Sequence, residues 1–194
     1  MQTVEKNQRV VLSYCIRSWG GELIEEAPYN SPISYVHGYG QILARLENAL
    51  EGKAPGESVS VRLRAAQAYG EWSEDYVRTV PNRDLAHIEG LAVGDEIEMR
   101  DGRWEIVDDS VPAPDPLFSD EAPFSDDDDG DGDDDGPSIY EVREIFEETA
   151  LLDGNHYLAG QDLIFDLHVL DVKPATFEEI ERCRWDCGPE DDLY

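Results

Sequence analysis

The sequence predicts an α+β fold, in which an antiparallel β-sheet packs against one helix. Apolar and polar residues alternate in several short segments separated by glycine-containing turns, as in antiparallel strands. Near the end of the chain, residues 163–170 form a very apolar segment of this kind. A strand this apolar completes a sheet begun earlier, and residues 10–17 are its expected partner. The chain therefore leaves its first sheet, forms other structure in between, and returns to add the last strand to that sheet.

The composition limits both the size and the partners of the protein. The chain has 194 residues, 40% of them hydrophobic and 9% aromatic, which is enough for one domain or two small ones. Its formal net charge is −30, and 13 of its 45 acidic residues lie between Asp108 and Asp135, so the remainder still carries −17. Nucleic acids and anionic membranes are therefore excluded as partners, because binding them needs exposed Lys and Arg. A surface this acidic favours solubility and suits a basic client.

The N-terminal residues and the cysteines favour a cytoplasmic protein. Residues 1–6 hold no apolar run of the kind found in signal peptides, and no window approaches the ~20 apolar residues of a membrane-spanning helix. Three cysteines are too few for a disulfide framework. Cys15 is expected to be buried in a strand, whereas Cys183 and Cys187 are expected to be surface thiols.

The first part of the chain is expected to form a small sheet. A turn signal, Trp19-Gly20-Gly21, joins two alternating segments into a hairpin. After Pro55-Gly56, Val59, Val61 and Leu63 alternate with polar residues and are expected to face inward. The strands expected here cover residues 10–18, 22–27, 33–37 and 58–63.

Two helices are expected in the chain. The longer covers residues 41–51, and Gly52 follows where a C-terminal cap belongs. Its apolar face consists of Ile42, Leu43, Leu46, Ala49 and Leu50. A short second helix follows Thr176, because Thr176 and Glu179 have the spacing of a capping box. The tail from Cys183 onward is expected to be loose.

Residues after Ala68-Tyr69-Gly70 are expected to form a second, β-rich module. Its strands are predicted over residues 96–100, 103–107, 139–146 and 149–152. Its expected core residues are Val77, Val80, Leu85 and Ile88. The acidic segment 108–137 inside this module is predicted to be disordered, because it holds too few apolar side chains to offset the entropy of ordering.

Two patterns that suggest metal binding are incomplete, so no metal or other cofactor is expected. Asp127, Asp129, Asp131 and Gly132 match the start of a calcium-binding loop, but the twelfth position is Ser138 instead of Glu. A solvated linker explains this acidic run better. The four histidines, His37, His87, His156 and His168, include no close pair of the kind that binds zinc. His156, in a turn beside Asn155, is expected to form a structural hydrogen bond.

The order of several motifs resembles that of FKBP-type peptidyl-prolyl isomerases of the SlyD-like branch. These motifs are a strand with Tyr14, then Tyr35-Val36-His37-Gly38, Leu46 to Gly52, Ala68-Tyr69-Gly70 and Asn155-His156-Tyr157-Leu158-Ala159-Gly160. The resemblance implies a bent antiparallel sheet wrapped on one helix and interrupted by a small insert-in-flap domain. The implied domains are residues 1–72 and 153–175 for the FKBP module, 73–152 for the insert, and 176–194 for a short helix and flexible tail.

The resemblance also implies a site and an activity. By position, the catalytic residues are Tyr14, Glu25, Tyr69 and Phe165, and the substrate-binding residues are Ile24, Ile33, Ile42, Leu43 and Leu46. Tyr69 would offer its hydroxyl to a substrate carbonyl, and Ile42 and Leu43 would lie at the rim of the cleft. Isomerisation of an X-Pro bond needs no nucleophile, metal or general base, so an apolar, concave site suffices. The implied substrates are unfolded or nascent polypeptides with accessible prolines, bound by a monomer that also holds such chains through its insert domain.

Two departures from the family pattern leave an alternative open. Glu25 stands where many members have Asp, and Arg45 stands where many have Gly. The longer carboxylate is expected to miss the Tyr14 hydroxyl, and Arg45 adds bulk beside the cleft. The alternatives are therefore a non-catalytic holdase, or an adaptor whose acidic insertion binds a basic partner. A protease-coupled assay on a proline peptide separates these from the enzyme.

Overall fold

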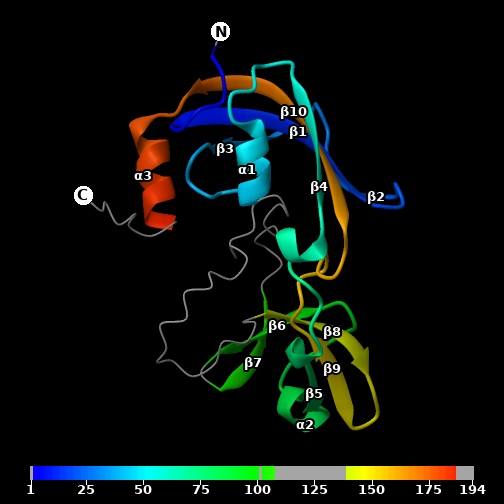
Figure 1. The fold of residues 1–194 in the computed structure, drawn as a ribbon. Coiled ribbons are helices and arrows are strands. Elements are labelled where there is room, and N and C mark those ends of the chain that lie inside the picture. Colours follow the sequence, from blue (N-terminus) through cyan, green and yellow to red (C-terminus); the bar gives the residue numbers. More distant parts are fainter. Residues whose placement is uncertain (1, 101, 108–138, 187–194) are drawn as a thin grey trace, which may run out of the picture. The chain divides into compact units, whose positions relative to one another are not determined.

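The computed structural model describes residues 2–100, 102–107 and 139–186 (Figure 1). The described residues form two compact units, which we treat separately: unit 1 comprises 2–69 and 161–186, and unit 2 comprises 70–107 and 139–160. The chain crosses between them at 69/70 and 160/161, whereas the sequence placed these boundaries at 72/73 and 152/153. The predicted disordered segment, the aspartates resembling a calcium loop and Cys187 lie outside the described residues.

Unit 1 contains a five-stranded antiparallel sheet. Its strands are β1 (Gln8–Ser18), β2 (Leu23–Ala27), β3 (Ile33–Val36), β4 (Ser58–Leu63) and β10 (Leu163–Pro174). Their order is β2-β1-β10-β4, and β3 also pairs with β1. β1 lies antiparallel to β10, with Tyr14 opposite Leu167. This pairing confirms that the last strand returns to the first one, as its apolar pattern predicts.

The two faces of β10 have different environments. Phe165 is fully buried, and Leu167 on the same face is almost so. On the opposite face, Asp166 and His168 are half-buried. Burial of each large apolar side chain contributes about 1.5–3 kcal/mol to folding. The predicted alternation is therefore correct, and the apolar face of this central strand forms the inner face of the sheet.

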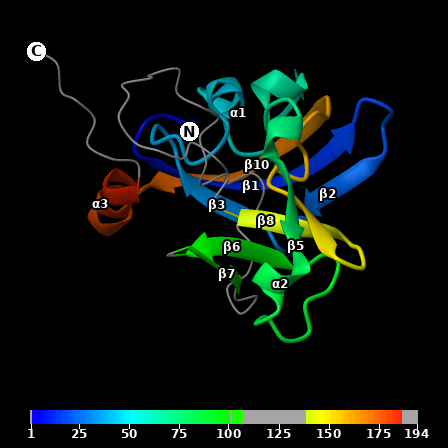
Figure 2. The ribbon, with the colours of Figure 1, turned by 90° about the horizontal axis from the view of Figure 1, so that it is seen from below.

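Helix α1 (Ala44–Leu50) lies on the inner face of this sheet and contacts β4 (Figures 1 and 2). It begins at Ala44 rather than at Gln41. The side-chain oxygen of Gln41 accepts the backbone N–H of Val36 at 2.7 Å, which holds Gln41 to the end of β3 and outside the helix. After the helix, Gly52 adopts a φ of 75°, a left-handed conformation that suits a C-terminal cap, as predicted.

Helix α3 (Phe177–Asp186) confirms the capping box but corrects the prediction for the tail. The Thr176 N–H donates to the Glu179 carboxylate at 2.7 Å, and the Glu179 N–H donates to the Thr176 hydroxyl at 3.2 Å. Cys183 is only 3% exposed and packs with Val36 and Tyr39. The chain therefore remains helical and packed at Cys183, because that side chain falls on the apolar face of α3.

Unit 2 contains a second antiparallel sheet with its own core. Its elements are β5 (Val77–Pro81), α2 (Asn82–Leu85), β6 (Glu96–Arg100), β7 (Arg103–Ile106), β8 (Ile139–Ile145) and β9 (Thr149–Asp153), and its strand order is β5-β9-β8-β6-β7. Val80 and Leu85 are buried in this core, and Ile88 packs against it, as predicted. Val77 is half-buried at the start of β5. Short 3-10 turns, η1 (Ala65–Gln67) and η2 (Glu74–Tyr76), flank the first crossing between the units.

Among the described residues, no helix is both long enough and apolar enough to span a membrane.

Candidate active site

The first pair of candidate site residues joins β1 to β2. Tyr14 is buried, and its hydroxyl donates a hydrogen bond to a carboxylate oxygen of Glu25 at 3.2 Å. The strand register explains this contact, because Tyr14 lies opposite Ala27 and Ile16 lies opposite Glu25. Tyr14 and Glu25 are thus diagonal neighbours on one face of the hairpin. The expectation that the longer carboxylate misses Tyr14 is wrong.

The second pair joins β10 to the turn that precedes the first crossing. The rings of Tyr69 and Phe165 lie 6.4 Å apart between centroids, with a tilt of 40°. This distance is within the range of favourable aromatic pairs. The turn before Tyr69 is held by Asp162, whose carboxylate accepts the Ala65 N–H at 3.0 Å. Tyr69 is half-buried, so it remains within reach of solvent and of a ligand.

The strand register places these two pairs on the same face of the sheet. Phe165 lies opposite Ile16, and Tyr14 lies opposite Leu167, so Tyr14 and Phe165 are diagonal neighbours on β1 and β10. Diagonal side chains on neighbouring strands are close enough for aromatic contact. The structure therefore gathers all four predicted catalytic residues on the inner face of unit 1.

The predicted substrate-binding residues divide into buried and half-buried groups. Ile42, Leu43 and Leu46 are 2%, 3% and 0% exposed, so the side chains of Ile42 and Leu43 belong to the apolar core rather than to an open rim. Ile33 is half-buried opposite Leu12. Ile24 is also half-buried and occupies the irregularity in register between β1 and β2. Half-buried Ile24, Ile33, Glu25 and Tyr69 are the predicted site residues that a ligand can reach.

A surface hollow of about 430 Å³ was not predicted from the sequence. Tyr14 is the predicted site residue that borders it. Its other lining residues are Ser13, Cys15, Ala27, Pro28, Tyr29, Ser58, Val59, Ser60, Asp166, Leu167 and His168. By strand alternation, Ser58, Ser60 and Ser13 point to the outer face of the sheet. Small hydroxyl side chains on β1 and β4, the two strands that flank β10, were the available signal, but it is visible only once the register is known.

Cys15 borders this hollow and is half-buried, which corrects the expectation of full burial. Burial raises the pKa of its thiol, and the nearby Arg17 opposes this effect only in part. A raised pKa keeps the thiol protonated at neutral pH and makes Cys15 a poor nucleophile.

The histidines act as hydrogen-bonding residues. In the turn after β9, His156 Nδ1 accepts the Leu158 N–H at 3.1 Å, the structural hydrogen bond predicted for it. Burial lowers the pKa of His156, so the neutral form needed for this bond dominates at neutral pH. His37 is bonded to Tyr35 and Glu51. His87 is bonded to the Trp104 carbonyl, and His168 to Ser58. Within the described part of the chain, no group of three or more His, Cys, Asp or Glu residues is placed to hold a metal ion.

Comparison with known proteins identifies the family. The sequence pattern of the FKBP-type peptidyl-prolyl cis-trans isomerases matches residues 1–105. This chain belongs to the FKBP-type peptidyl-prolyl cis-trans isomerase family. Proteins named FKBP-type peptidyl-prolyl cis-trans isomerase SlyD are similar along almost its whole length. The protein from Yersinia pestis is 35% identical over 92% of this chain and 75% of its own length, and that from Pasteurella multocida is 34% identical over 91% and 73%.

A SlyD protein from Escherichia coli strain K12 is 32% identical over 91% of this chain and 74% of its own length. Among solved structures, FkpA from Escherichia coli aligns with a TM-score of 0.39 and 13% identity, covering 90% of this chain and 44% of that one. Because the family pattern and the SlyD proteins match this chain, it is a SlyD-like peptidyl-prolyl isomerase, and its substrates are polypeptides that contain proline.

Proposed function

We propose that this isomerase acts on X-Pro bonds of unfolded or nascent proteins in the cytoplasm, as a monomer, and that unit 2 holds these chains during catalysis. The catalytic half of the proposal rests on one observation: the aromatic residues Tyr14, Tyr69 and Phe165 share the inner face of unit 1. The holding half rests on the exposed apolar surface of unit 2 described below.

The proposed catalytic roles follow from exposure and polarity. Buried Phe165 and Tyr14 form the apolar floor and wall, together with Leu46, and Glu25 fixes the Tyr14 hydroxyl. Half-buried Tyr69 offers its hydroxyl to a substrate carbonyl. Twisting the peptide bond removes its resonance, which is the origin of a barrier of ~18–20 kcal/mol. An apolar surface that excludes water from the bond and binds the twisted form better than the planar forms lowers this barrier.

Tyr69→Phe is expected to retain the fold and to lower kcat/KM on a short X-Pro peptide by about 2–10-fold, the effect of one hydrogen bond of ~0.5–1.5 kcal/mol. The phenyl ring preserves the contact with Phe165, so only the polar group is lost. The measurement is a protease-coupled peptide assay. Tyr29→Phe is the matched control, because Tyr29 is 74% exposed and borders the outer-face hollow. Wild-type activity in Tyr69→Phe would exclude the proposed role of its hydroxyl.

The surface proposed to hold client chains continues the core of unit 2. On β6, buried Ile97 and 44% exposed Met99 lie on one face of the sheet. On the neighbouring strand β7, buried Trp104 and 43% exposed Ile106 lie on the same face. Within the described residues, β7 pairs with β6 alone and is one edge of the sheet (Figure 2). An apolar face beside an open strand edge can bind an extended chain through side-chain pockets and backbone hydrogen bonds.

Ile106→Glu is expected to reduce suppression of client aggregation and client affinity by about tenfold, because a carboxylate would be desolvated when a client covers it. Ile139→Glu is the matched control. Ile139 is also 43% exposed, but it lies opposite Glu98 and therefore on the other face of the sheet. Light scattering of an aggregating client and titration with an unfolded protein measure both variants. Equal losses in the two variants would show that this face does not hold clients.

A further inference from the structure

We propose that Asn155 is a positioning residue for isomerisation of protein clients, because it locks together the two chain segments through which unit 2 leaves and rejoins the rest of the chain. The proposal rests on the function proposed above, and assigns to Asn155 the coupling between client holding and client isomerisation. Asn155 lies outside the proposed catalytic residues and outside the client-holding surface.

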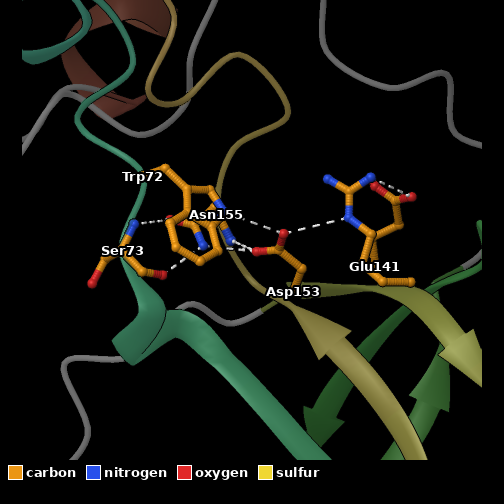
Figure 3. A network of polar contacts seen from close by, with 6 residues as sticks. Trp72, Ser73, Glu141, Asp153 and Asn155 are labelled. Atoms are coloured by element: carbon orange, nitrogen blue, oxygen red, sulfur yellow. Dashed lines mark hydrogen bonds and ion pairs between the residues drawn. The ribbon is translucent and has the colours of Figure 1, made fainter.

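The lock consists of one side-chain amide bonded to both backbone groups of one residue (Figure 3). The Ser73 N–H donates to Asn155 Oδ1 at 2.8 Å, and Asn155 Nδ2 donates to the Ser73 carbonyl at 2.8 Å. These residues are 82 positions apart in the sequence. The amide therefore acts like one rung of a β-ladder between segments 70–76 and 153–160.

Asp153 orients this amide. One carboxylate oxygen of Asp153 accepts both the backbone N–H of Asn155 at 2.9 Å and its Nδ2 at 2.7 Å. The other accepts the Trp72 indole N–H at 3.5 Å (Figure 3). It also forms an ion pair with Arg143 at 3.4 Å. Burial alone would raise the pKa of Asp153, but these partners together lower it. The carboxylate is therefore ionised at neutral pH and remains an acceptor for Asn155.

Backbone hydrogen bonds continue the lock in both directions along the two segments. The Gly154 N–H donates to the Tyr76 carbonyl at 2.9 Å, and the Gly160 N–H donates to the Gly70 carbonyl at 2.9 Å. Gly70 is the first residue of unit 2 and Gly160 is the last, and both have positive φ, 81° and 73°. A Cβ on Gly160 would lie 3.0 Å from the Trp72 Cβ, so the segments are closely packed there.

These bonds tie segments 70–76 and 153–160 to each other from β5 and β9 up to the crossings. Without the Asn155 side chain, both bonds to Ser73 are lost, and the segments are held together more weakly between the crossings and the Val77–Asp153 pair of β5 and β9. A client held on unit 2 would then present its proline to the catalytic face over a wider range of geometries. Catalysis is sensitive to such misplacement, whereas client binding and reaction of a free peptide are not.

The test compares Asn155→Ala with Asn82→Ala in the full chain. The amide of Asn82 also bonds to backbone carbonyls of unit 2, those of Phe146 and Glu147 at 2.9 and 3.2 Å, but at the opposite end of β5. In Asn155→Ala, kcat for proline-limited refolding of a protein client is expected to fall about tenfold. Its KM and the kcat/KM for a short peptide should stay unchanged. Asn82→Ala should match the wild type in all three quantities.

Amide hydrogen exchange shows whether the lock has opened without unfolding. In Asn155→Ala, the Ser73 and Gly160 amides should exchange faster, while Ile97 and Leu152 in the core retain their protection. If Asn155→Ala does not fold, Asn155→Asp replaces it. That variant keeps an acceptor for the Ser73 N–H, but it loses the donor to the Ser73 carbonyl and adds a charge beside Asp153.

Two results would overturn the inference while leaving the proposed function intact. One is an unchanged refolding kcat although the Ser73 amide exchanges faster. The other is an equal loss in Asn155→Ala and Asn82→Ala, accompanied by a raised KM, which would indicate general destabilisation of unit 2. If instead the proposed function is wrong, Ile106→Glu and Ile139→Glu should bind clients equally well. That result would remove the basis of both proposals.

Discussion

Phe165→Ala is expected to abolish isomerase activity and to lower the free energy of unfolding by about 3–5 kcal/mol. Phe165 is fully buried on the central strand of unit 1, between Ile16 of β1 and Val61 of β4. Truncation removes the ring that contacts Tyr69 and leaves a cavity beneath the proposed site. Since a small domain is stable by only about 5–15 kcal/mol, the loss is a large fraction of the total. Denaturant titration and the peptide assay measure the two effects.

Loss of activity in Phe165→Ala has to be separated from loss of folded protein. Phe165→Leu retains most of the buried volume and should remain folded, yet it lacks the aromatic contact with Tyr69 and should still lose most of its activity. Phe177→Ala is the matched control within unit 1, because Phe177 is 76% exposed and its truncation should change neither property. Wild-type turnover by folded Phe165→Leu and Phe165→Ala would show that the site lies elsewhere.

The sheet of unit 1 could be predicted because its register follows from alternation. β1 and β10 each carry an apolar face that requires burial, and a shift of one residue would expose every buried side chain of the strand. The ends of α1 were less predictable. Ile42 and Leu43 fit a helical pattern but precede the helix, because the side chain of Gln41 is bonded to the end of β3. The start of α1 therefore depends on a hydrogen bond to a strand outside the helix, and the sequence around Gln41 does not indicate that bond.

The features of the structure that escaped prediction depend on contacts between distant segments. Ser73 and Asn155 are both ordinary turn residues, and their pairing across 82 positions appears only in the folded chain. The outer-face hollow likewise depends on the register of three strands. The prediction of an exposed Cys183 was wrong for a related reason, because a helix rich in charged residues gives little local evidence of packing. The side chain is covered by Val36 and Tyr39, which are distant in the sequence.

Replacing residues 71–159 with a short Gly-containing loop is expected to spare isomerisation of short peptides and to lower catalysis of proline-limited refolding on the order of 10²-fold. The four proposed catalytic residues, Tyr14, Glu25, Tyr69 and Phe165, all lie in unit 1 and are unaffected by the exchange. Gly70 and Gly160 are retained because the Gly160 N–H bonds to the Gly70 carbonyl at 2.9 Å, so a short loop can close the gap.

The size of this effect follows from tethering. A client held on unit 2 is presented to the catalytic face at an effective concentration in the millimolar range, far above that of a free unfolded protein in an assay at ~10 μM. Removing unit 2 removes this advantage for protein clients, whereas a short peptide reaches the catalytic face without being held. Peptide and refolding assays are run on the same two proteins. If both activities fell by the same factor, unit 2 would be part of the catalytic site itself, and its separate role in holding clients would be wrong.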